Sequence, residues 1–541
     1  MARPIGELLT EAGIINEEMI RYALQVQKVS KERLGEILLR LRFVTDTEIA
    51  RVLSEQSGHP FTDLAGVLPE VEVLRQLPYN FAQRYDLLPV ALENGELIVV
   101  TADPFDDQGL SRISRFARNP IRLQVAPRSK LREDIQHHYY FAEHPIEQEV
   151  ERIATAAQSE RNWSPERLVE LLIDTAIDMG ASDVHINPTG FATLVSYRID
   201  GVLQLRYSLP AQIHHRLSST IKIESSMDIA EMNRPQDGRR TYAFLQEEYD
   251  LRVSIIPTIR GENVVIRVLS GGGELISAES IGFRAEQVEA VQRIADRPFG
   301  MLLVTGPTGS GKSTTLYAML RKINAMEKNV LTIEDPVEYN MPLIRQMAVN
   351  ERAGITFSSA IRNFLRQDPD VMLVGEIRDG ETAGLAVTAA QTGHLVLSTL
   401  HTNDASGAIP RLRDLGVEDF LISSSLAGIV AQRLVRRLCP YCKEEVPLAA
   451  QEKERLKLNV DIVQQHVGCE HCQDTGYIGR TAVGEVLEVD DDIRRLIDAQ
   501  ATSLAIKAAC VEKGMKTMWD SALQLVEQGV TDLYEIERVI I

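Results

Sequence analysis

Two stretches at the start of the chain carry the same pattern of apolar and polar positions. Residues 4–27 (PIGELLTEAGIINEEMIRYALQVQ) and 33–56 (RLGEILLRLRFVTDTEIARVLSEQ) align at a constant offset of 29, so that Gly6 pairs with Gly35. In each copy the apolar residues recur three or four positions apart, a spacing that is typical of amphipathic helices. The pattern therefore predicts two copies of one helical unit.

Each copy also carries a signal for a second helix. Asn16 and Thr45 hold equivalent positions just before acidic residues, where a side-chain oxygen can cap the start of a helix. We therefore predict that residues 1–58 form a small helical module built from two helix pairs.

The segments that follow carry strand and helix signals in short blocks. Residues 59–145 contain two β-rich runs around an Asn-Gly turn and then helical patterns, which predicts a small α/β domain. Residues 146–163 are polar and weakly patterned, and we interpret them as a linker. Residues 164–270 begin with a capped helix and continue in strands, which predicts a second, PAS-like α/β domain. The glycine-rich residues 271–280 are interpreted as a flexible joint.

The rest of the chain has the pattern of a larger core. Over residues 281–435 strands and helices alternate, which indicates a parallel sheet with helical crossovers. Residues 436–485 hold two pairs of cysteines, and residues 486–541 are helical. The predicted fold class is therefore a multidomain α/β protein, in which small α/β domains and an N-terminal helical module precede the main core.

Composition narrows the possible classes of protein. The chain has 541 residues, of which 44% are hydrophobic and 25% charged, as in ordinary globular proteins. No apolar run approaches the ~18 residues of a membrane span. The first residues lack the cationic and apolar regions of a signal peptide, so we expect a cytoplasmic location. The formal net charge of −19 counts against general nucleic-acid binding, although a local basic patch stays open.

One segment has the spacing of a phosphate-binding loop. After Gly306 and four further residues come Gly311, Lys312 and Ser313, which is the pattern G-x-x-x-x-G-K-[ST]. An apolar run precedes it and a helical pattern follows, the context in which backbone N–H groups surround a phosphate. Lys312 is expected to reach the β- and γ-phosphates of ATP or GTP, and Ser313 to ligate Mg²⁺. The predicted nucleotide-binding residues of this loop are Gly306, Pro307, Thr308, Gly309, Ser310, Gly311, Lys312, Ser313 and Thr314.

Hydrolysis needs acidic groups beyond this loop, and two later segments offer them. The apolar residues 371–374 lead to Glu376, and the apolar residues 330–333 lead to Glu334 and Glu338. Ligands of open α/β sheets bind at the carboxyl ends of the strands. Glu376 is therefore a candidate for holding the Mg²⁺ shell or orienting water, while capping or solvation of loops is the alternative for such acids.

Two histidines stand at either end of another predicted strand. His394 precedes the apolar residues 395–400, and His401 follows them. A lone histidine is more often structural, but two at strand ends are candidates for sensing the γ-phosphate or transmitting its loss.

Four of the five cysteines fall into two CxxC pairs. Cys439 and Cys442 are separated by 26 residues from Cys469 and Cys472. Four thiolates at such spacing predict a closed, tetrahedral and structural Zn²⁺ site. Redox pairs and reduced core cysteines are the alternatives. Cys510 stands in a helical stretch and is predicted to be a buried apolar residue.

Taken together, these motifs resemble the secretion ATPases of GspE/PilB/MshE type, which serve type II secretion and type IV pilus assembly. The matching segments are GPTGSGKST, TIEDPVEY, DPDVMLVGEIRD and TGHLVLSTLHTNDA, which are similar to the family's Walker A, Asp box, Walker B and His box. Upstream, ASDVHI, YRIDG, RPQDGRR and LRVSIIPTIRGENVVIRVL look like its second N-terminal domain, and downstream GYIGRTAVGEVL looks like its zinc-proximal segment. The segments follow the family's order over most of the chain.

The resemblance implies a RecA-like core and a homohexamer whose domains move against one another during ATP turnover. It implies that Glu376 is the Walker B glutamate and that Glu334 activates the attacking water, with Lys312, His394 and His401 completing the catalytic set. Arginines of the preceding domain help to bind the triphosphate in this family, and an ordinary surface ion pair is the alternative for each. The candidates in this chain are Arg239, Arg252 and Arg267.

The same resemblance implies a place and partners for the protein. It implies an ATPase that powers assembly of a type IV pilus or a type II secretion pseudopilus from the cytoplasmic face of the inner membrane. An inner-membrane platform protein and a docking protein are the expected partners, and ATP, Mg²⁺ and Zn²⁺ the cofactors. The alternative is a P-loop nucleic-acid translocase with a zinc ribbon, which the acidic balance and the Asp and His boxes disfavour.

The doubled opening is similar to an MshEN domain, in which two 24-residue motifs joined by a five-residue spacer bind cyclic di-GMP. That motif begins Arg-Leu-Gly, has a glycine at its tenth position and ends in glutamine, whereas here Pro4 replaces one arginine and Arg42 one glycine. Two interpretations stay open: a cyclic di-GMP sensor, and a helical docking module that has kept the fold and lost the ligand. The candidate ligand residues are Arg3, Gly6, Gly13, Gln27, Arg33, Gly35 and Gln56.

Overall fold

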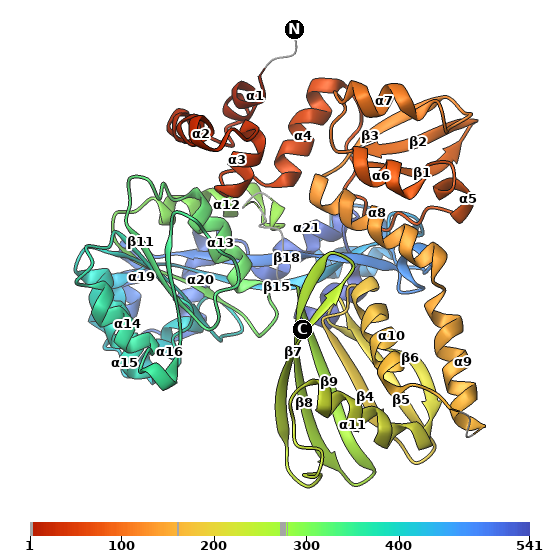
Figure 1. Ribbon diagram of the computed structural model, residues 1–541. Coiled ribbons are helices and arrows are strands. Elements are labelled where there is room, and N and C mark those ends of the chain that lie inside the picture. The colour runs from red at the N-terminus through yellow and green to blue at the C-terminus, as the bar shows by residue number, and fades with distance from the viewer. Residues whose placement is uncertain (1–3, 160–161, 271–276, 278–279, 541) are drawn as a thin grey trace. The chain divides into compact units, whose positions relative to one another are not determined.

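The computed structural model describes residues 4–159, 162–270, 277 and 280–540, and it divides into two compact units (Figure 1). One unit combines Met1–Ile49 with Glu274–Ile541, and the other is Ala50–Gly273. The flexible joint predicted at 271–280 lies almost wholly outside the described residues. Among the residues that are described, no helix is both long enough and apolar enough to cross a membrane.

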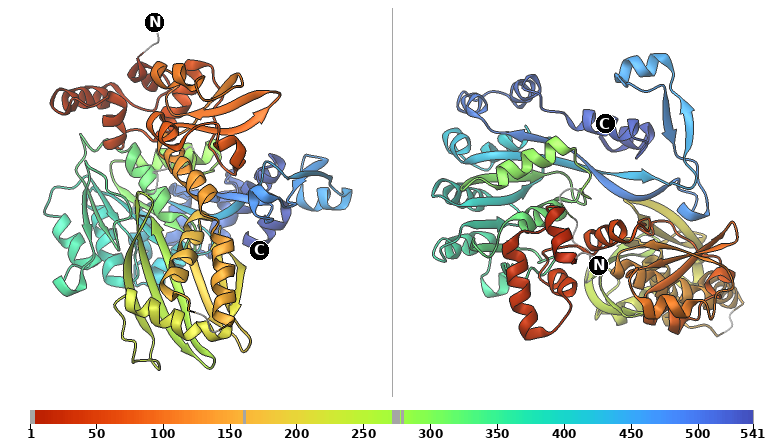
Figure 2. Two further views of the ribbon diagram at one scale, coloured as in Figure 1. Left: turned by 45° about the vertical axis from the view of Figure 1, so that its right-hand side comes forward. Right: turned by 90° about the horizontal axis from the view of Figure 1, so that it is seen from above.

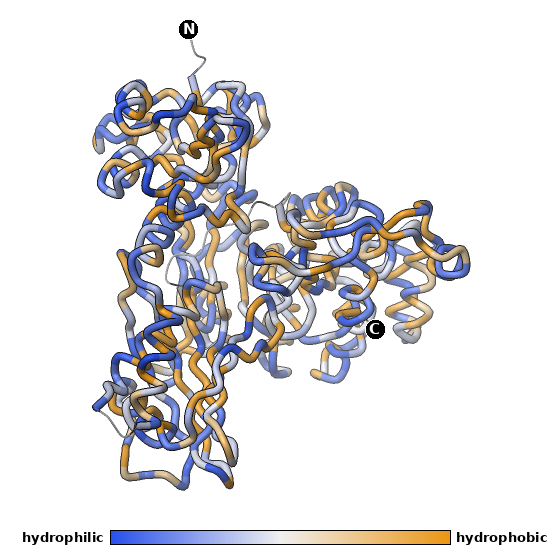
Figure 3. The backbone as a smooth tube through the Cα atoms, turned by 90° about the vertical axis from the view of Figure 1, so that its right-hand side faces the viewer, coloured by the Kyte–Doolittle hydropathy of each residue, from blue (hydrophilic) through white to orange (hydrophobic). Residues whose placement is uncertain are grey.

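The doubled opening folds as two helix pairs, as predicted. Asn16 Oδ1 accepts a hydrogen bond of 2.9 Å from the Met19 N–H, and Thr45 Oγ1 accepts one of 3.1 Å from the Glu48 N–H. Both predicted caps are therefore confirmed. In Figure 3 the coils near the N-terminus alternate between hydrophobic and hydrophilic stretches, as amphipathic helices do. The helices are α1 (Ile5–Glu11), α2 (Glu17–Ser30), α3 (Leu34–Arg40) and α4 (Asp46–Ser57).

The two copies also share the turn that follows their first helix. Gly13 has a φ of +69°, and Arg42, at the equivalent position, has a φ of +61°. The Gly13 N–H donates to the Thr10 carbonyl at 2.9 Å, and the Arg42 N–H donates to the Leu39 carbonyl at the same distance. A left-handed conformation costs a non-glycine residue about 1–2 kcal/mol. The second copy therefore has the same backbone turn as the first. Arg42 adds a side chain there and takes a conformation that is strained for a residue other than glycine.

A small α/β domain follows the helices, as predicted. Strands β1 and β2 are antiparallel around a turn at Asn94 and Gly95, and β3 is parallel to β2. Apolar side chains on the two faces of this sheet form two separate cores. The elements are α5 (Val71–Leu74), α6 (Tyr79–Tyr85), β1 (Leu87–Glu93), β2 (Glu96–Thr101), α7 (Asp107–Ile113), β3 (Ile121–Val125) and α8 (Arg128–Glu143).

The linker predicted at 146–163 is wrong for most of its length, because α9 (Ile146–Gln158) is a regular helix. Its apolar residues Ile146, Val150, Ile153 and Ala157 are buried in the core that α10 also joins. They stand four, three and four positions apart, which is the spacing of one helix face. The many polar residues between them make the segment polar on average. The narrow apolar stripe was therefore not recognised as a helix signal.

The second small domain is an antiparallel sheet covered by helices on one face (Figure 2). Its six strands have the order β6-β5-β4-β9-β8-β7. Alternate residues of the strands enter the core with α10 and α11, so the other residues lie on the opposite face. The elements are α10 (Pro165–Asp178), β4 (Asp183–Pro188), β5 (Ala192–Ile199), β6 (Val202–Pro210), α11 (His214–Glu224), β7 (Gln236–Phe244), β8 (Glu247–Thr258) and β9 (Gly261–Ser270).

The predicted parallel core is a seven-stranded sheet of order β12-β11-β13-β14-β10-β15-β18. Neighbouring strands from β12 to β15 are parallel, and β18 is antiparallel to β15. The inner strands β10, β11, β13 and β14 are buried along their whole length because both faces of the sheet are covered. The strands are β10 (Gly300–Thr305), β11 (Val330–Glu334), β12 (Arg345–Ala348), β13 (Val371–Val374), β14 (Leu395–Leu400), β15 (Leu426–Leu438) and β18 (Tyr477–Glu488).

Successive residues of β10 show how the two faces of this sheet are filled. Leu302 and Val304 pack with α12 and α13, whereas Met301 and Leu303 pack in a second core with α14, α15 and the C-terminal helices. The helices are α12 (Ala285–Ala295), α13 (Lys312–Lys322), α14 (Phe357–Phe364), α15 (Gly380–Gln391), α16 (Ala408–Asp414), α17 (Asp419–Ser425), α19 (Asp491–Asp498), α20 (Ser503–Glu512), α21 (Met518–Glu527) and α22 (Leu533–Ile540).

The cysteine segment is continuous with the central sheet. Strand β18 crosses the predicted boundary at residue 485 because it pairs with β15 along nearly its whole length. The insert between the cysteine pairs is a small β-hairpin with one short helix. Its elements are β16 (Glu444–Pro447), α18 (Ala450–Leu456) and β17 (Ile462–Gln465).

Candidate active site and metal centre

The predicted phosphate loop joins β10 to α13 at the carboxyl edge of the central sheet. Gly306, Gly309 and Gly311 have φ values of +152°, +77° and +84°, which glycine adopts without strain. The Lys312 ammonium donates to the Gly306 carbonyl at 2.9 Å and to the Pro307 carbonyl at 3.0 Å. The ammonium therefore lies over the loop, where the β- and γ-phosphates of a nucleotide are held in loops of this kind.

Strand β15 supplies a frame for the loop that the motifs did not reveal. The buried Gln432 side chain donates to the Ser310 carbonyl at 2.7 Å and accepts from the Thr315 hydroxyl at 2.8 Å. A Cβ at Gly306 would come within 2.5 Å of the Gln432 carbonyl oxygen, so the loop lies directly against the β15 backbone. The signal in the sequence was the polar pair Gln432 and Arg433 inside the otherwise apolar run 428–435.

Glu376 follows β13 at the same edge of the sheet. Its Oε1 lies 3.0 Å from His401 Nε2, and its Oε2 accepts a hydrogen bond of 2.8 Å from Arg378 Nε. Burial lowers the pKa of Lys312, and the Glu376 carboxylate opposes this shift while Arg433 adds to it. The structure thus brings together Lys312, Glu376 and His401 as predicted, and it adds Arg433, which sequence reasoning missed.

Glu334 ends β11 at this edge, but its carboxylate is turned into the protein. It is 5% exposed and accepts hydrogen bonds from the hydroxyls of Tyr317 and Thr332 and from the Gln346 amide. A general base must be within hydrogen-bond reach of the water that it deprotonates. Glu338, four residues later, is exposed. This geometry gives Glu334 a fixed structural place, and its role in activating water stays a prediction.

The structure separates the two histidines of the predicted pair. His401 follows β14 at the edge that carries the phosphate loop, whereas His394 precedes the same strand. The His394 carbonyl accepts from the Gly300 N–H at 3.1 Å, at the start of β10. His394 Nδ1 lies 2.9 Å from the Ala389 carbonyl, at the end of α15. His394 therefore lies at the amino edge of the sheet and is not part of the site formed by Glu376 and His401.

The three candidate arginines lie side by side in the second unit. Arg239 is directly opposite Arg252, and Arg252 is directly opposite Arg267, on the neighbouring strands β7, β8 and β9. They project from the face turned away from α10 and α11, and line a shallow cavity of about 390 Å³.

The arginine row continues through an acid to a further arginine. Asp183 is opposite both Arg267 and Arg198, with Oδ1 accepting from Arg267 Nε at 3.2 Å and Oδ2 3.7 Å from Arg198 Nε. Arg198 belongs to the YRIDG segment and was not predicted as a site residue. The row therefore has four guanidinium groups with one buried carboxylate between two of them.

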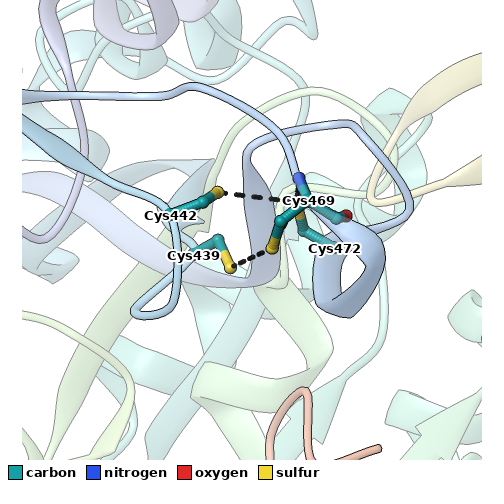
Figure 4. A group of neighbouring side chains, drawn as sticks. All are labelled: Cys439, Cys442, Cys469 and Cys472. Carbon is teal, nitrogen blue, oxygen red and sulfur yellow. Dashed lines mark hydrogen bonds between the residues drawn. The ribbon is translucent and has the colours of Figure 1, made fainter.

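The four paired cysteines form one cluster (Figure 4). Their Sγ atoms all lie within 4.8 Å of one another, and three of the separations are 3.8 Å. A tetrahedral zinc ion with Zn–S bonds of about 2.3 Å requires Sγ–Sγ separations of about 3.8 Å. The donor set and its spacing therefore fit Zn²⁺. Cys510 is buried in α20, as predicted.

The candidate cyclic di-GMP residues occupy equivalent places in the two copies. Gly6 and Gly35 lie in the first turns of α1 and α3, where an added Cβ would meet other atoms only at 3.4 Å or more. Packing alone therefore does not demand glycine at either position. The side chain of Gln27 donates to a spacer carbonyl at 2.9 Å. Arg3 lies outside the described residues, and Gln56 belongs to the other unit.

Comparison with known families accounts for most of the chain. A family model described as Type II/IV secretion system protein matches residues 158–538, which is more than half of the sequence. The chain belongs to the type II/IV secretion system protein family. A second model, described as MshEN domain, matches residues 57–145. The MshEN match thus falls on the small α/β domain, whereas the resemblance in the sequence was drawn on residues 1–58.

Relatives of this secretion protein match it over nearly its whole length. The type IV pilus assembly ATPase PilB of Myxococcus xanthus is 36% identical, over 99% of this chain and 98% of that protein. The type II secretion system protein E of Xanthomonas campestris pv. campestris is 37% identical, with the same coverage of both chains. The solved structure of the ATPase DotB of Legionella pneumophila is 21% identical, covers 70% of this chain and 96% of that one, and has a TM-score of 0.51.

These findings fix the class of this type II/IV secretion system protein. The DotB likeness shows the fold of the ATPase core, and the family shows the activity. The chain is therefore an ATP-hydrolysing enzyme with a RecA-like core, as the family resemblance implied.

Proposed function

We propose that this chain is the hexameric motor that powers assembly of a type IV pilus or of a type II secretion pseudopilus. It works at the cytoplasmic face of the inner membrane. Relatives spanning the whole chain are a pilus assembly ATPase and a type II secretion protein, which supports this choice. The observation that carries it is the meeting of Lys312, Glu376 and His401 at one edge of the central sheet.

The donors at this edge fit ATP and Mg²⁺. The Ser313 hydroxyl is exposed at the start of α13, and Glu376 is partly exposed beyond β13. Both offer the oxygen ligands that Mg²⁺ takes. Bound Mg²⁺ supplies positive charge against the oxygens of the transferred phosphoryl group. Lys312 supplies a second positive charge there, and His401 and Arg378 hold the Glu376 carboxylate in place.

Between Glu334, which ends β11, and Glu338, which lies four residues later, Glu338 is the better candidate for orienting the attacking water. It is exposed, whereas Glu334 is buried among three donors. Glu338→Gln should abolish hydrolysis and leave the fold unchanged, since its side chain is exposed. Glu334→Gln should lower the thermal midpoint of unfolding, because two hydroxyl groups lose a charged acceptor.

The arginine row of the second unit is proposed to bind the triphosphate within the hexamer. Arg239, Arg252 and Arg267 present adjacent guanidinium groups, of which Arg239 and Arg267 are exposed. Phosphate oxygens match the forked donors of arginine, and positive charge placed on the transferred group is a large contribution to the rate. Arg198 extends the same row.

The remaining features suit a motor that docks on a membrane machine. A platform protein of the inner membrane and a docking protein are the proposed partners, with the N-terminal domains as the contact. The cysteine cluster is proposed to hold a structural Zn²⁺ ion that closes the hairpin beside β15 and β18. Metal analysis of the purified protein should give one zinc per chain, and removal of the metal should lower thermal stability more than the affinity for ATP.

Cyclic di-GMP is proposed as a ligand of the doubled opening. The equivalent left-handed turns at Gly13 and Arg42 and the uncrowded glycines Gly6 and Gly35 support this proposal. Calorimetry with cyclic di-GMP on the full chain tests this proposal. No heat at high micromolar ligand would leave these helices as a docking module.

The motor itself is tested by Lys312→Ala in the host cell, with Lys322→Ala on the same helix as the control. Lys312→Ala should abolish both ATP hydrolysis and assembly of the filament at normal protein abundance, while Lys322→Ala should retain both. The native mass with ATP should be that of a hexamer. Filament assembly by an inactive ATPase, or turnover that rises with DNA in place of filament assembly, would contradict the proposal.

A further inference from the structure

Within its unit, the N-terminal helical module packs against the ATPase core. The Glu48 carboxylate accepts two hydrogen bonds from Arg321 Nη2, at 2.6 Å and 2.5 Å. Only 14% of the Glu48 side chain and 8% of the Arg321 side chain is exposed. Beside this pair, Asn324 Nδ2 donates to Glu18 Oε2 at 3.2 Å. The first pair is thus a nearly buried charge contact, and removing either partner leaves the other charge uncompensated.

The two helices that carry this pair strengthen it. Glu48 lies in the first turn of α4, and Arg321 lies in the last turn of α13. A carboxylate near a helix N-terminus and a cation near a helix C-terminus are both stabilised by the helix dipoles. The contact therefore fixes the C-terminal end of α13, the helix that begins directly after the phosphate loop.

The same junction between the N-terminal helices and the core reaches residues 338–344, which run from the end of the TIEDPVEY segment into the residues after it. Arg42 lines it together with Met341 and Ile344. Burial and the Glu338 carboxylate raise the pKa of Tyr339, and Arg42 opposes this shift. Tyr339 therefore lies within electrostatic reach both of an N-terminal charge and of the exposed acid proposed to orient water.

Hydrogen bonds tie this segment to α13. The Tyr317 hydroxyl donates to Glu334 and accepts from the Tyr339 N–H at 3.3 Å. The Gln346 amide donates to Glu334 at 3.3 Å and to the Tyr339 carbonyl at 2.9 Å. Tyr317 lies one turn before Arg321 on α13. The segment that carries the exposed acid is thus fixed between a tyrosine on this helix and the end of β11.

We propose that Tyr317 is a positioning residue for ATP hydrolysis, and that the N-terminal helices fix it through the pair of Glu48 with Arg321. Tyr317 acts through the segment that bears Glu338, and the junction holds both α13 and residues 341–344. The inference rests on the proposed role of Glu338. Loss of a positioning contact should lower kcat, since small displacements of a reacting group cost up to ~100-fold in rate. The affinity for ATP should stay unchanged, because the phosphate loop binds the nucleotide.

The test is steady-state hydrolysis by the full chain as a function of ATP concentration. Tyr317→Phe should lower kcat by about 10-fold and Glu48→Gln by about 3-fold, with KM unchanged within about 2-fold. Arg321→Gln should match Glu48→Gln. Arg321→Lys should keep most of the rate, because a single nitrogen makes both hydrogen bonds. Glu7→Gln, an exposed acid of α1, is the matched control and should leave kcat unchanged.

Hydrogen exchange provides a readout that general destabilisation would not reproduce. In Glu48→Gln, exchange should accelerate over residues 335–344 while β10 and β14 stay protected. Wild-type kcat in Glu48→Gln, or a loss shared equally by Glu7→Gln, would overturn the inference. So would a change confined to KM.

The two proposals fail in different ways. If Lys312→Ala abolishes hydrolysis while Tyr317→Phe and Glu48→Gln keep wild-type kcat, the positioning inference alone is wrong. If Glu338→Gln keeps its activity, the proposed role of Glu338 is wrong, and the positioning inference that rests on it falls too.

Discussion

The two surfaces that we propose for ATP are built in different ways. The phosphate-loop edge of the central sheet is assembled from short contiguous motifs, each of which follows a strand of one parallel sheet. The arginine row is assembled across strands, because its members are distant in sequence and become neighbours only through strand register. The first surface can be predicted from short motifs together with the rule that ligands bind at the carboxyl ends of parallel strands. The second surface depends on the pairing of distant strands.

The two surfaces also differ in how their charges are balanced. At the first, Glu376 is paired with Arg378 and His401, and Lys312 donates to two loop carbonyls. In the second, Arg252 has an arginine directly opposite it on both neighbouring strands. Like charges directly opposite one another destabilise a sheet by roughly 0.2–1 kcal/mol per pair. Nearby acids offset part of this repulsion, because Arg252 Nε donates to Asp250 Oδ2 at 3.4 Å and Asp183 lies between Arg267 and Arg198.

The largest effect should come from the first surface. Glu376→Gln keeps the shape of the side chain and removes its charge, so the proposed Mg²⁺ site loses a ligand and His401 loses its anionic partner. We expect kcat to fall by at least about 100-fold while ATP still binds, as measured by hydrolysis and by nucleotide binding. Glu381→Gln, an exposed acid of α15, serves as control. More than a tenth of wild-type turnover in Glu376→Gln would remove this edge from the mechanism.

The arginine row should have the next largest effect. Arg252→Gln removes the middle guanidinium, and we expect kcat to fall by about 10- to 100-fold, more than for Arg239→Gln or Arg267→Gln. Arg260→Gln, at the exposed turn between β8 and β9, changes the same charge outside the row. Equal losses in Arg252→Gln and Arg260→Gln would show that net charge matters rather than the row.

The contrast between the surfaces also marks what the sequence could predict. Lys312 and Ser313 could be identified because a short spacing rule describes the loop, and Glu376 because it follows an apolar strand. Gln432 was missed because it contacts the loop from a strand more than a hundred residues later. Its role depends on β15 lying next to β10, which no local pattern specifies.

Other misses have the same physical origin. His394 and His401 look alike in the sequence, yet a parallel strand places its two ends at opposite edges of the sheet. The neighbours of the arginines, Arg198 and Asp183, needed the antiparallel register. The helix α9 needed its apolar stripe to be weighed separately from its mean polarity. Helices with caps, turns and short motifs were predictable, and pairings between distant segments were not.

The frame of the phosphate loop should have a smaller effect than its catalytic groups. Gln432→Leu keeps a similar volume and removes both hydrogen bonds to the loop and α13. Leaving the Ser310 carbonyl and the Thr315 hydroxyl unpaired costs about 1–3 kcal/mol each, so we expect lower stability and an increase in KM for ATP of about 5- to 10-fold. Gln391→Leu, an exposed glutamine, is the matched control. An unchanged KM would show that the loop holds its shape without β15.

The smallest effect should come from the acid inside the arginine row. Asp183→Asn keeps the shape of the side chain and removes the charge that attracts Arg267 and Arg198. Without that charge the two guanidiniums repel each other across β4, and Arg267 loses its fixed orientation. We expect kcat to fall by about 2- to 5-fold, because the guanidinium still reaches the ligand but from more than one orientation. The double variant Asp183→Asn with Arg267→Gln should then turn over no more slowly than Arg267→Gln alone. A further loss in the double variant would mean that Asp183 acts on the site independently of Arg267, and that the row is a set of separate charges rather than one surface.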